Sequence, residues 1–256
     1  MQKTIAPALT ALLDGFIDYA GLFPPAKVPL GEALSNYEHY NKGEYAWMLR
    51  WFVVAANEAS QIPEAMSGKL SILADSDNPR AATLESTSVI AAAHPVYCEV
   101  PIKELGRLEG VKQSGNFAKI RTGGLKPEAI PSPADVSAFI LACADLRLPF
   151  KATAGLHHPI RKEYALTYES DAPRAVMHGF INVLLASAFA WHGEKQIEPI
   201  ISEMDATAFS FDGAAHWQGK SLSAAQIRDA RANFIHSVGS CSFDEPVHDL
   251  QTLGLL

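Results

Sequence analysis

The feature that most constrains this fold is the repeated alternation of short strand-like runs with helical patterns. Such an order is typical of βα units wound around a parallel sheet. Eight runs rich in β-branched or aromatic residues fit the strand pattern: LRWFVV (49–54), KLSILAD (69–75), AATLES (81–86), PVYCEVP (95–101), FAKIRTG (117–123), PFKATAG (149–155), AFSFDG (208–213) and FIHSVGS (234–240). Over 256 residues this predicts an α/β fold, a (β/α)8 barrel of TIM type with parallel strands in one domain, residues 1–256.

Helical patterns fill the gaps between the later runs, over 132–146, 172–193 and 221–234. The first 45 residues do not fit the alternation. A helix expected over 6–17 runs into DYAGLFPPAKVPL, whose glycine and prolines disfavour regular structure. We expect residues 1–45 to be a helical and proline-rich extension packing on the barrel. It would either close the barrel floor or bring Asp18 or Tyr19 to the site.

Charge and composition exclude several classes of partner. A net charge of −7 and a pI near 5.7 argue against binding nucleic acid or an anionic membrane surface. Three widely spaced cysteines without a CxxC pair indicate reduced thiols and a cytoplasmic protein. The opening MQKTIAPALTALLDGF lacks the long apolar stretch of a signal peptide, and FINVLLASAFAW (180–191) is too short to span a bilayer. The oligomeric state is left open, a homo-oligomer included.

Charged residues occur inside several expected strands, where both faces should be apolar. The two-residue period puts Lys119 and Arg121 on one face of FAKIRTGG and pairs Lys151 with Thr153 in PFKATAG. The inward face of a barrel tolerates polar groups near the carboxyl ends of the strands. The residues expected to converge there are Lys119, Arg121, Lys151, Thr153 and Glu99, with Glu85 and Arg50 as further candidates.

Such a cluster of charges has two interpretations. The cations could hold a carboxylate or phosphate while a neighbouring group serves as acid or base. Alternatively, Glu85 and Glu99 simply neutralise Lys119 and Lys151 in a buried ionic network. The two interpretations are compatible, because an ion pair can also position a lysine for chemistry.

The segment GLHHPIR follows the sixth run and should emerge at the functional end of the barrel. His157 and His158 suit acid–base work or metal binding, or are exposed loop histidines. No HxH or HExxH spacing supports a metal, so no cofactor is assigned and a divalent metal is kept as an alternative. Ser240 lies where such barrels often bind phosphate, although acidic residues follow it. Cys241 has no histidine beside it in the sequence.

Two resemblances accompany these motifs. Over essentially its whole length, the chain resembles a bacterial family with GLFPPA, KIRTGG, KATAGLHHPIR and GSCSFDEP motifs, a family to which no activity is assigned. A second, local similarity is to class I aldolases of the deoxyribose-phosphate type, whose Schiff-base lysine lies on the sixth barrel strand in a Lys-Thr-small-Thr-Gly setting. FKATAG places Lys151 similarly, with Thr153 and Gly155 after it, but Ala152 departs from the pattern.

Three functions remain open at this stage. The first is a lyase, aldolase or isomerase acting on a small anionic carbonyl compound through Lys151, with Lys119 lowering its pKa and Glu99 or His157 moving protons. The second is a metal-dependent lyase or isomerase using His157, His158 and Glu99. The third is a non-catalytic barrel that binds an anionic metabolite. The residues expected to contact the ligand are Arg121, Thr153, His158, Arg50, Glu85 and Ser240.

Overall fold

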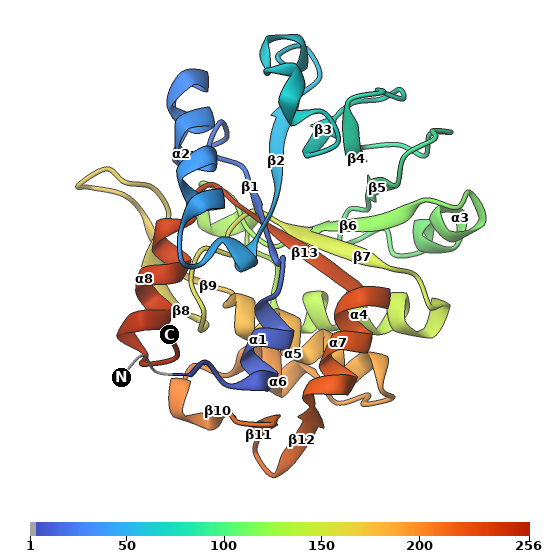
Figure 1. The fold of residues 1–256 in the computed structure, drawn as a ribbon. Coiled ribbons are helices and arrows are strands. Elements are labelled where there is room, and N and C mark those ends of the chain that lie inside the picture. The colour runs from blue at the N-terminus through green and yellow to red at the C-terminus, as the bar shows by residue number, and fades with distance from the viewer. Residues whose placement is uncertain (1–3) are drawn as a thin grey trace.

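Eight parallel strands close into a barrel in the computed structural model, which describes residues 4–256 (Figure 1). Neighbours around the barrel follow chain order, and the first strand pairs with both the second and the last. The strands are β1 (Ile17–Tyr19), β2 (Leu49–Ala55), β3 (Leu70–Leu73), β4 (Ala81–Ser86), β5 (Val96–Glu99), β6 (Phe117–Arg121), β7 (Phe150–Thr153) and β13 (Ile235–Ser240). The predicted α/β barrel is therefore confirmed.

The first barrel strand lies inside the segment that we expected to be an extension. Strand β1 has three residues, all buried, and aligns Ile17 with Val238 on one side and with Leu49 on the other. The helix before it, α1 (Pro7–Leu13), packs against α7 and the small sheet at the amino-terminal ends of the strands. Residues 17–19 thus belong to the barrel itself, and the count of the strands from β2 to β7 moves up by one.

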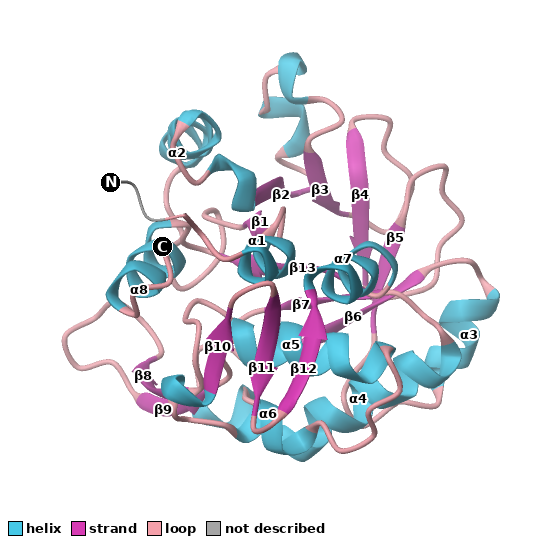
Figure 2. Ribbon diagram, turned by 60° about the horizontal axis from the view of Figure 1, so that its bottom comes forward, coloured by secondary structure: helices cyan, strands magenta, loops and turns pink. Residues whose placement is uncertain are grey.

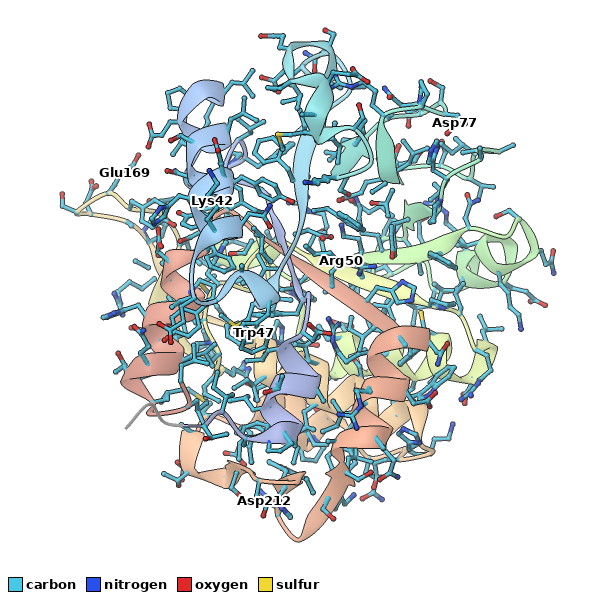
Figure 3. All side chains as sticks on the ribbon, in the orientation of Figure 1. Lys42, Trp47, Arg50, Asp77, Glu169 and Asp212 are labelled. Atoms are coloured by element: carbon cyan, nitrogen blue, oxygen red, sulfur yellow. The ribbon has the colours of Figure 1, made fainter. Side chains whose placement is uncertain are left out.

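The run at 208–213 is not a barrel strand, contrary to our prediction. It contains β10 (Phe209–Phe211), which forms an antiparallel sheet with β11 (Ala214–Trp217) and β12 (Lys220–Ser223). Only Asp212 and Gly213 separate β10 from β11, and a connection this short can join only antiparallel strands. The sheet lies at the end of the molecule where α1 and α7 pack (Figure 2), and Asp212 marks its turn (Figure 3).

Helices cover the barrel unevenly. They are α2 (Leu30–Lys42), α3 (Arg107–Gln113), α4 (Pro133–Leu146), α5 (Phe180–Trp191), α6 (Glu198–Ser202), α7 (Ala224–Asn233) and α8 (Asp244–Thr252), after α1. Short 3₁₀ turns add η1 (Ala46–Met48), η2 (Ala59–Gln61), η3 (Glu64–Met66), η4 (Pro127–Ala129) and η5 (Ala206–Ala208). Within residues 4–256, the connections from β2 to β5 hold no α-helix. The wall from β6 to β13 is consequently the better covered.

The predicted helix boundaries hold at two capped sites and fail at a third. Ser132 begins α4 with a capping box to Asp135, and Ser223 caps α7. The helix expected over 172–193 starts only at Phe180. The residues before it form β9 (Arg174–Met177), paired with β8 (Lys162–Ala165) in an antiparallel hairpin. Glu169, near the tip of this hairpin, lies at the edge of the molecule (Figure 3).

The described residues include one helical stretch, Pro127–Leu146, that is long and apolar enough by length and composition to cross a membrane. The stretch comprises η4 and α4. In this barrel α4 packs beside α5 and α6, and its Val136, Phe139 and Ile140 side chains are fully buried. These contacts are those of a core helix in a closed barrel.

Candidate active site

The charged residues of the strands converge inside the barrel, as the two-residue period predicts. Strand register aligns Glu99 with Lys119, and Lys119 with Lys151. Glu85 on β4 reaches both lysines. Since β1 is the first strand, Lys119 lies on the sixth barrel strand and Lys151 on the seventh.

Lys151 is fully buried in a set of short ionic contacts. Its Nζ lies 2.5 Å from Oδ2 of Asp18 and 2.7 Å from Oε1 of Glu85. Ser237 donates to the same Asp18 oxygen at 2.7 Å, and Ser71 donates to the same Glu85 oxygen at 2.8 Å. Burial alone would lower the pKa of Lys151, but the two carboxylates outweigh burial and raise it. The expectation that Lys119 lowers this pKa is therefore wrong, and Lys151 is a charged ammonium.

Lys119 lies beside this cluster and connects it to the cavity. Its Nζ is 3.1 Å from Oε2 of Glu85 and 3.0 Å from Oε2 of Glu99. Burial tends to raise the pKa of Glu85, but Lys151 and Lys119 together bring it below its ordinary value. Glu85 is thus an ionised bridge between the two lysines. The ionic network and the candidate site share the same residues.

A cavity of about 310 Å³ lies at the carboxyl ends of the strands. Its polar lining comprises Glu85, Lys119, Arg121, Thr153, His157 and Cys241. Its apolar lining includes Phe23, Pro24, Pro25, Val53, Leu73, Leu125, Leu166 and Met177. Lys151 is not among the lining residues, so Lys119 is the lysine that a ligand meets first.

The loops after β6 and β7 pack backbone against backbone. A Cβ on Gly123 would lie 2.9 Å from Cα of Gly155, which only two glycines allow. Thr122 strengthens the contact by donating to the carbonyl of Ala154 at 2.7 Å. This packing explains the KIRTGG and KATAG motifs as one structural unit.

Arg121 and Thr153 align across β6 and β7 and both line the cavity. The Arg121 side chain is exposed, and within residues 4–256 it has neither an ion pair nor a hydrogen bond. An unpaired guanidinium at a cavity mouth is suited to binding an anion. Arg121 is therefore the candidate that most resembles a ligand contact.

His157 faces the cavity from the loop after β7, beside Ser240 at the end of the last strand and Cys241 directly after it. Its Nδ1 lies 3.0 Å from Oγ of Ser240 and 3.8 Å from Sγ of Cys241. Burial, with a smaller contribution from His158, lowers the pKa of His157 to about 4, so the ring is neutral at pH 7. Burial raises the pKa of the Cys241 thiol, whose Sγ also lies 3.7 Å from the hydroxyl of Tyr168.

Several candidate residues lie elsewhere. Arg50 donates to the carbonyl of His236 at 2.8 Å and does not line the cavity. His158 stacks on Tyr164 with ring centroids 3.6 Å apart, pairs with Asp249 and lines a separate cavity of about 190 Å³. Neither of these two predicted ligand contacts, Arg50 and His158, lines the cavity of about 310 Å³ at the carboxyl ends of the strands. Both are held by backbone or side-chain partners of their own.

Glu99 reaches Lys119 but lines a neighbouring cavity of about 490 Å³, shared with Arg121. His178 precedes α5, and its Nε2 lies 2.8 Å from the carbonyl of Pro131. Asn182 instead accepts from the amide of Arg161 at 2.9 Å. Both hold loops in place rather than reaching the site.

The described side chains that could bind a metal ion do not lie close together. Among residues 4–256, no group of three or more His, Cys, Asp or Glu side chains is arranged to hold one. His158 faces Asp249 rather than Glu99. The residues named for the metal-dependent alternative therefore do not fit that role together.

Three residues of the site carry weak signals in the sequence. Asp18 belongs to a strand of only three residues, and Ser71 alternates with apolar residues in β3. Cys241 meets His157 across 84 residues of chain, a contact that only barrel closure creates. The alternation within LSIL could have identified Ser71.

Neither a protein-family model, nor a curated protein, nor a solved structure matches this chain. Function is therefore inferred from the site alone.

Proposed function

We propose that the protein is an enzyme of the lyase, aldolase or isomerase class that forms an imine between Lys119 and a small anionic carbonyl compound. The observation that carries this proposal is the position of Lys119, whose amine lines the cavity between two carboxylates. The role moves from Lys151 to Lys119 because Lys151 is sealed beneath the cavity. Lys119 is also on the sixth strand, where the similar aldolases carry their lysine.

Imine formation needs a neutral amine and a place for the protons. In the proposed step, Glu99 takes a proton from the Lys119 ammonium, with which it is in contact at 3.0 Å. The amine attacks the carbonyl carbon, and the carbinolamine oxygen leaves as water after taking protons from the carboxyl group and the nitrogen. Glu99 suits this exchange better than Glu85, because its side chain is 24% exposed and Glu85 is held ionised by two lysines.

A second acid or base, His157, lines the cavity together with Lys119. The neutral imidazole of His157 can accept a proton from the substrate, and its Nδ1 is oriented by Ser240. Lys151 acts indirectly: its ion pairs keep Asp18 and Glu85 charged and in position. These roles give one amine and one imidazole that line the same cavity, with one carboxylate in contact with the amine from the neighbouring cavity.

Reductive trapping tests the proposal. The protein is incubated with borohydride and a panel of 2-oxo acids, longer oxo acids and 2-deoxyribose 5-phosphate, and labelled peptides are mapped by mass spectrometry. We expect an adduct on Lys119 that disappears in Lys119→Arg, a variant that keeps the positive charge but forms no imine. Lys126→Arg, in an exposed loop, should label like the wild type. Ligand binding with no adduct on Lys119 would instead support the non-catalytic barrel.

A further inference from the structure

We infer that the ligand of this cavity is a monocarboxylate with an apolar chain, not a phosphate. For the oxo acids that would be substrates, the inference rests on the proposed function. For carboxylate binding alone, it rests only on the charge and the lining of the cavity.

The charges around the cavity leave room for one negative charge at its mouth. Within residues 4–256, the ion pairs of Asp18, Glu85 and Glu99 are all with Lys119 and Lys151, so three carboxylates meet two ammonium groups. Arg231 interacts with Asp18 without forming an ion pair. The ion-paired groups of the floor therefore carry no positive charge to spare. Among the described residues that line the cavity, Arg121 is the one charged group without an ion pair, which matches a carboxylate and leaves a phosphate dianion undercompensated.

The usual phosphate position of such barrels is closed here. The loop after β13 leads into α8, whose first turn carries Asp244 and Glu245. Both carboxylates would repel an anion at this helix end. Ser240 has already donated its hydroxyl to the carbonyl of Ser242 at 2.6 Å, so it offers no free donor.

The cavity walls suit an apolar chain. Val53, Leu73, Leu166 and Met177 line it together with Phe23. A volume of about 310 Å³ lies at the small end of the range for ligand pockets. The hydroxyl groups of a sugar would find few hydrogen-bond partners against such walls, and burying them unpaired is unfavourable.

The positions of Lys119 and Arg121 along β6 determine where the two ends of the ligand bind. Lys119 and Arg121 point to the same side of one strand, and their Cα atoms are about 6.6 Å apart by strand geometry. A carboxylate at Arg121 and a carbonyl at Lys119 therefore belong at opposite ends of a short chain. This favours an oxo acid whose carbonyl is several carbons from the carboxylate.

Calorimetric titration tests this inference with four probes: 4-methylpentanoate, 5-oxohexanoate, 2-deoxyribose 5-phosphate and inorganic phosphate. We expect the two carboxylates to bind at least about tenfold more tightly than either phosphate. Arg121→Gln should weaken carboxylate binding by about tenfold or more. Lys126→Gln removes an exposed charge from the loop after β6 without touching the cavity, and should bind like the wild type.

The outcomes separate this inference from the proposed enzyme. Carboxylate binding through Arg121 without any trapped adduct would support the ligand class and overturn the imine. An adduct of Lys119 with 2-deoxyribose 5-phosphate, but not with 5-oxohexanoate, would overturn the ligand class and support the imine. Equal carboxylate binding by Arg121→Gln and the wild type would also overturn the inference.

Discussion

Two lysines face the barrel interior on adjacent strands, but their surroundings differ. Lys151 is fully buried, and two carboxylates contact its Nζ within 2.7 Å. Lys119 borders the cavity and has longer contacts of 3.0 and 3.1 Å. Adjacent strand positions therefore do not give the two lysines the same surroundings. Lys119 borders the cavity, whereas Lys151 lies deeper and shares Glu85 with it.

The largest expected effect comes from removing the buried charge. Lys151→Met leaves Asp18 and Glu85 without their ammonium partner, and breaking a buried pair in this way costs about 3–5 kcal/mol. Urea denaturation at pH 7 measures the loss. Lys119→Met should lose less free energy of unfolding, because its partner Glu99 is in part solvated. A larger loss for Lys119→Met would reverse the comparison between the two lysines.

The second-largest expected effect is the pH dependence of the folding stability that His157 contributes from the cavity wall. The pKa of His157 falls from 6.5 to about 4 on folding, mainly because of burial. A lowered pKa means that its stabilising contribution is complete above pH 6.5 and is lost as the pH falls towards 4. Between pH 7 and pH 5 we expect His157 to account for about 2 kcal/mol of lost stability.

Urea denaturation of His157→Gln at both pH values checks this expectation, since the variant should lose less stability on acidification than the wild type. His39→Gln, which removes an exposed histidine, serves as the control and should follow the wild type. The same acid loss in His157→Gln and wild type would show that His157 is solvated, and hence that the cavity wall is open around it.

Local alternation explains why the inward charges could be predicted. On β6 and β7 the side chains alternate between faces, so Lys119, Arg121 and Lys151 fall on the interior side whatever the rest of the chain does. The number of strands needs more than local pattern. Strand β1 is only three residues long and depends on β2 and β13 for its hydrogen bonds, so nothing in its own sequence marks it as a strand.

At 208–213 the sequence predicts a barrel strand that the barrel does not contain, because this strand-like run pairs in a separate sheet. The Asp212–Gly213 turn was the available signal, because it joins β10 to β11 as a hairpin. The meeting of His157 with Cys241 had no local signal at all, because it follows from the adjacency of β7 and β13. Closure of the barrel, rather than sequence proximity, assembled this part of the site.

The third effect concerns the shape of the wall rather than its charge. In Gly123→Ala the new Cβ would lie 2.9 Å from Cα of Gly155, so one loop must move. We expect a loss of about 1–3 kcal/mol in urea denaturation. Gly110→Ala is the matched control: it lies within α3, meets open space and should raise stability by about 0.5–1 kcal/mol. Equal effects of the two substitutions would show that the loops after β6 and β7 are not tightly packed.

The smallest expected effect is a difference in alkylation rate between the thiol at the cavity and the two thiols in the core. Cys241 lines the cavity, whereas Cys98 and Cys143 are fully buried in the core. Burial raises the pKa of all three thiols, so each reacts slowly with iodoacetamide and access sets their order. We expect Cys241 to be alkylated first in peptide mass maps, and 4-methylpentanoate to slow its labelling without changing that of Cys98. Faster labelling of Cys143 would mean that the core opens more readily than the cavity admits a reagent.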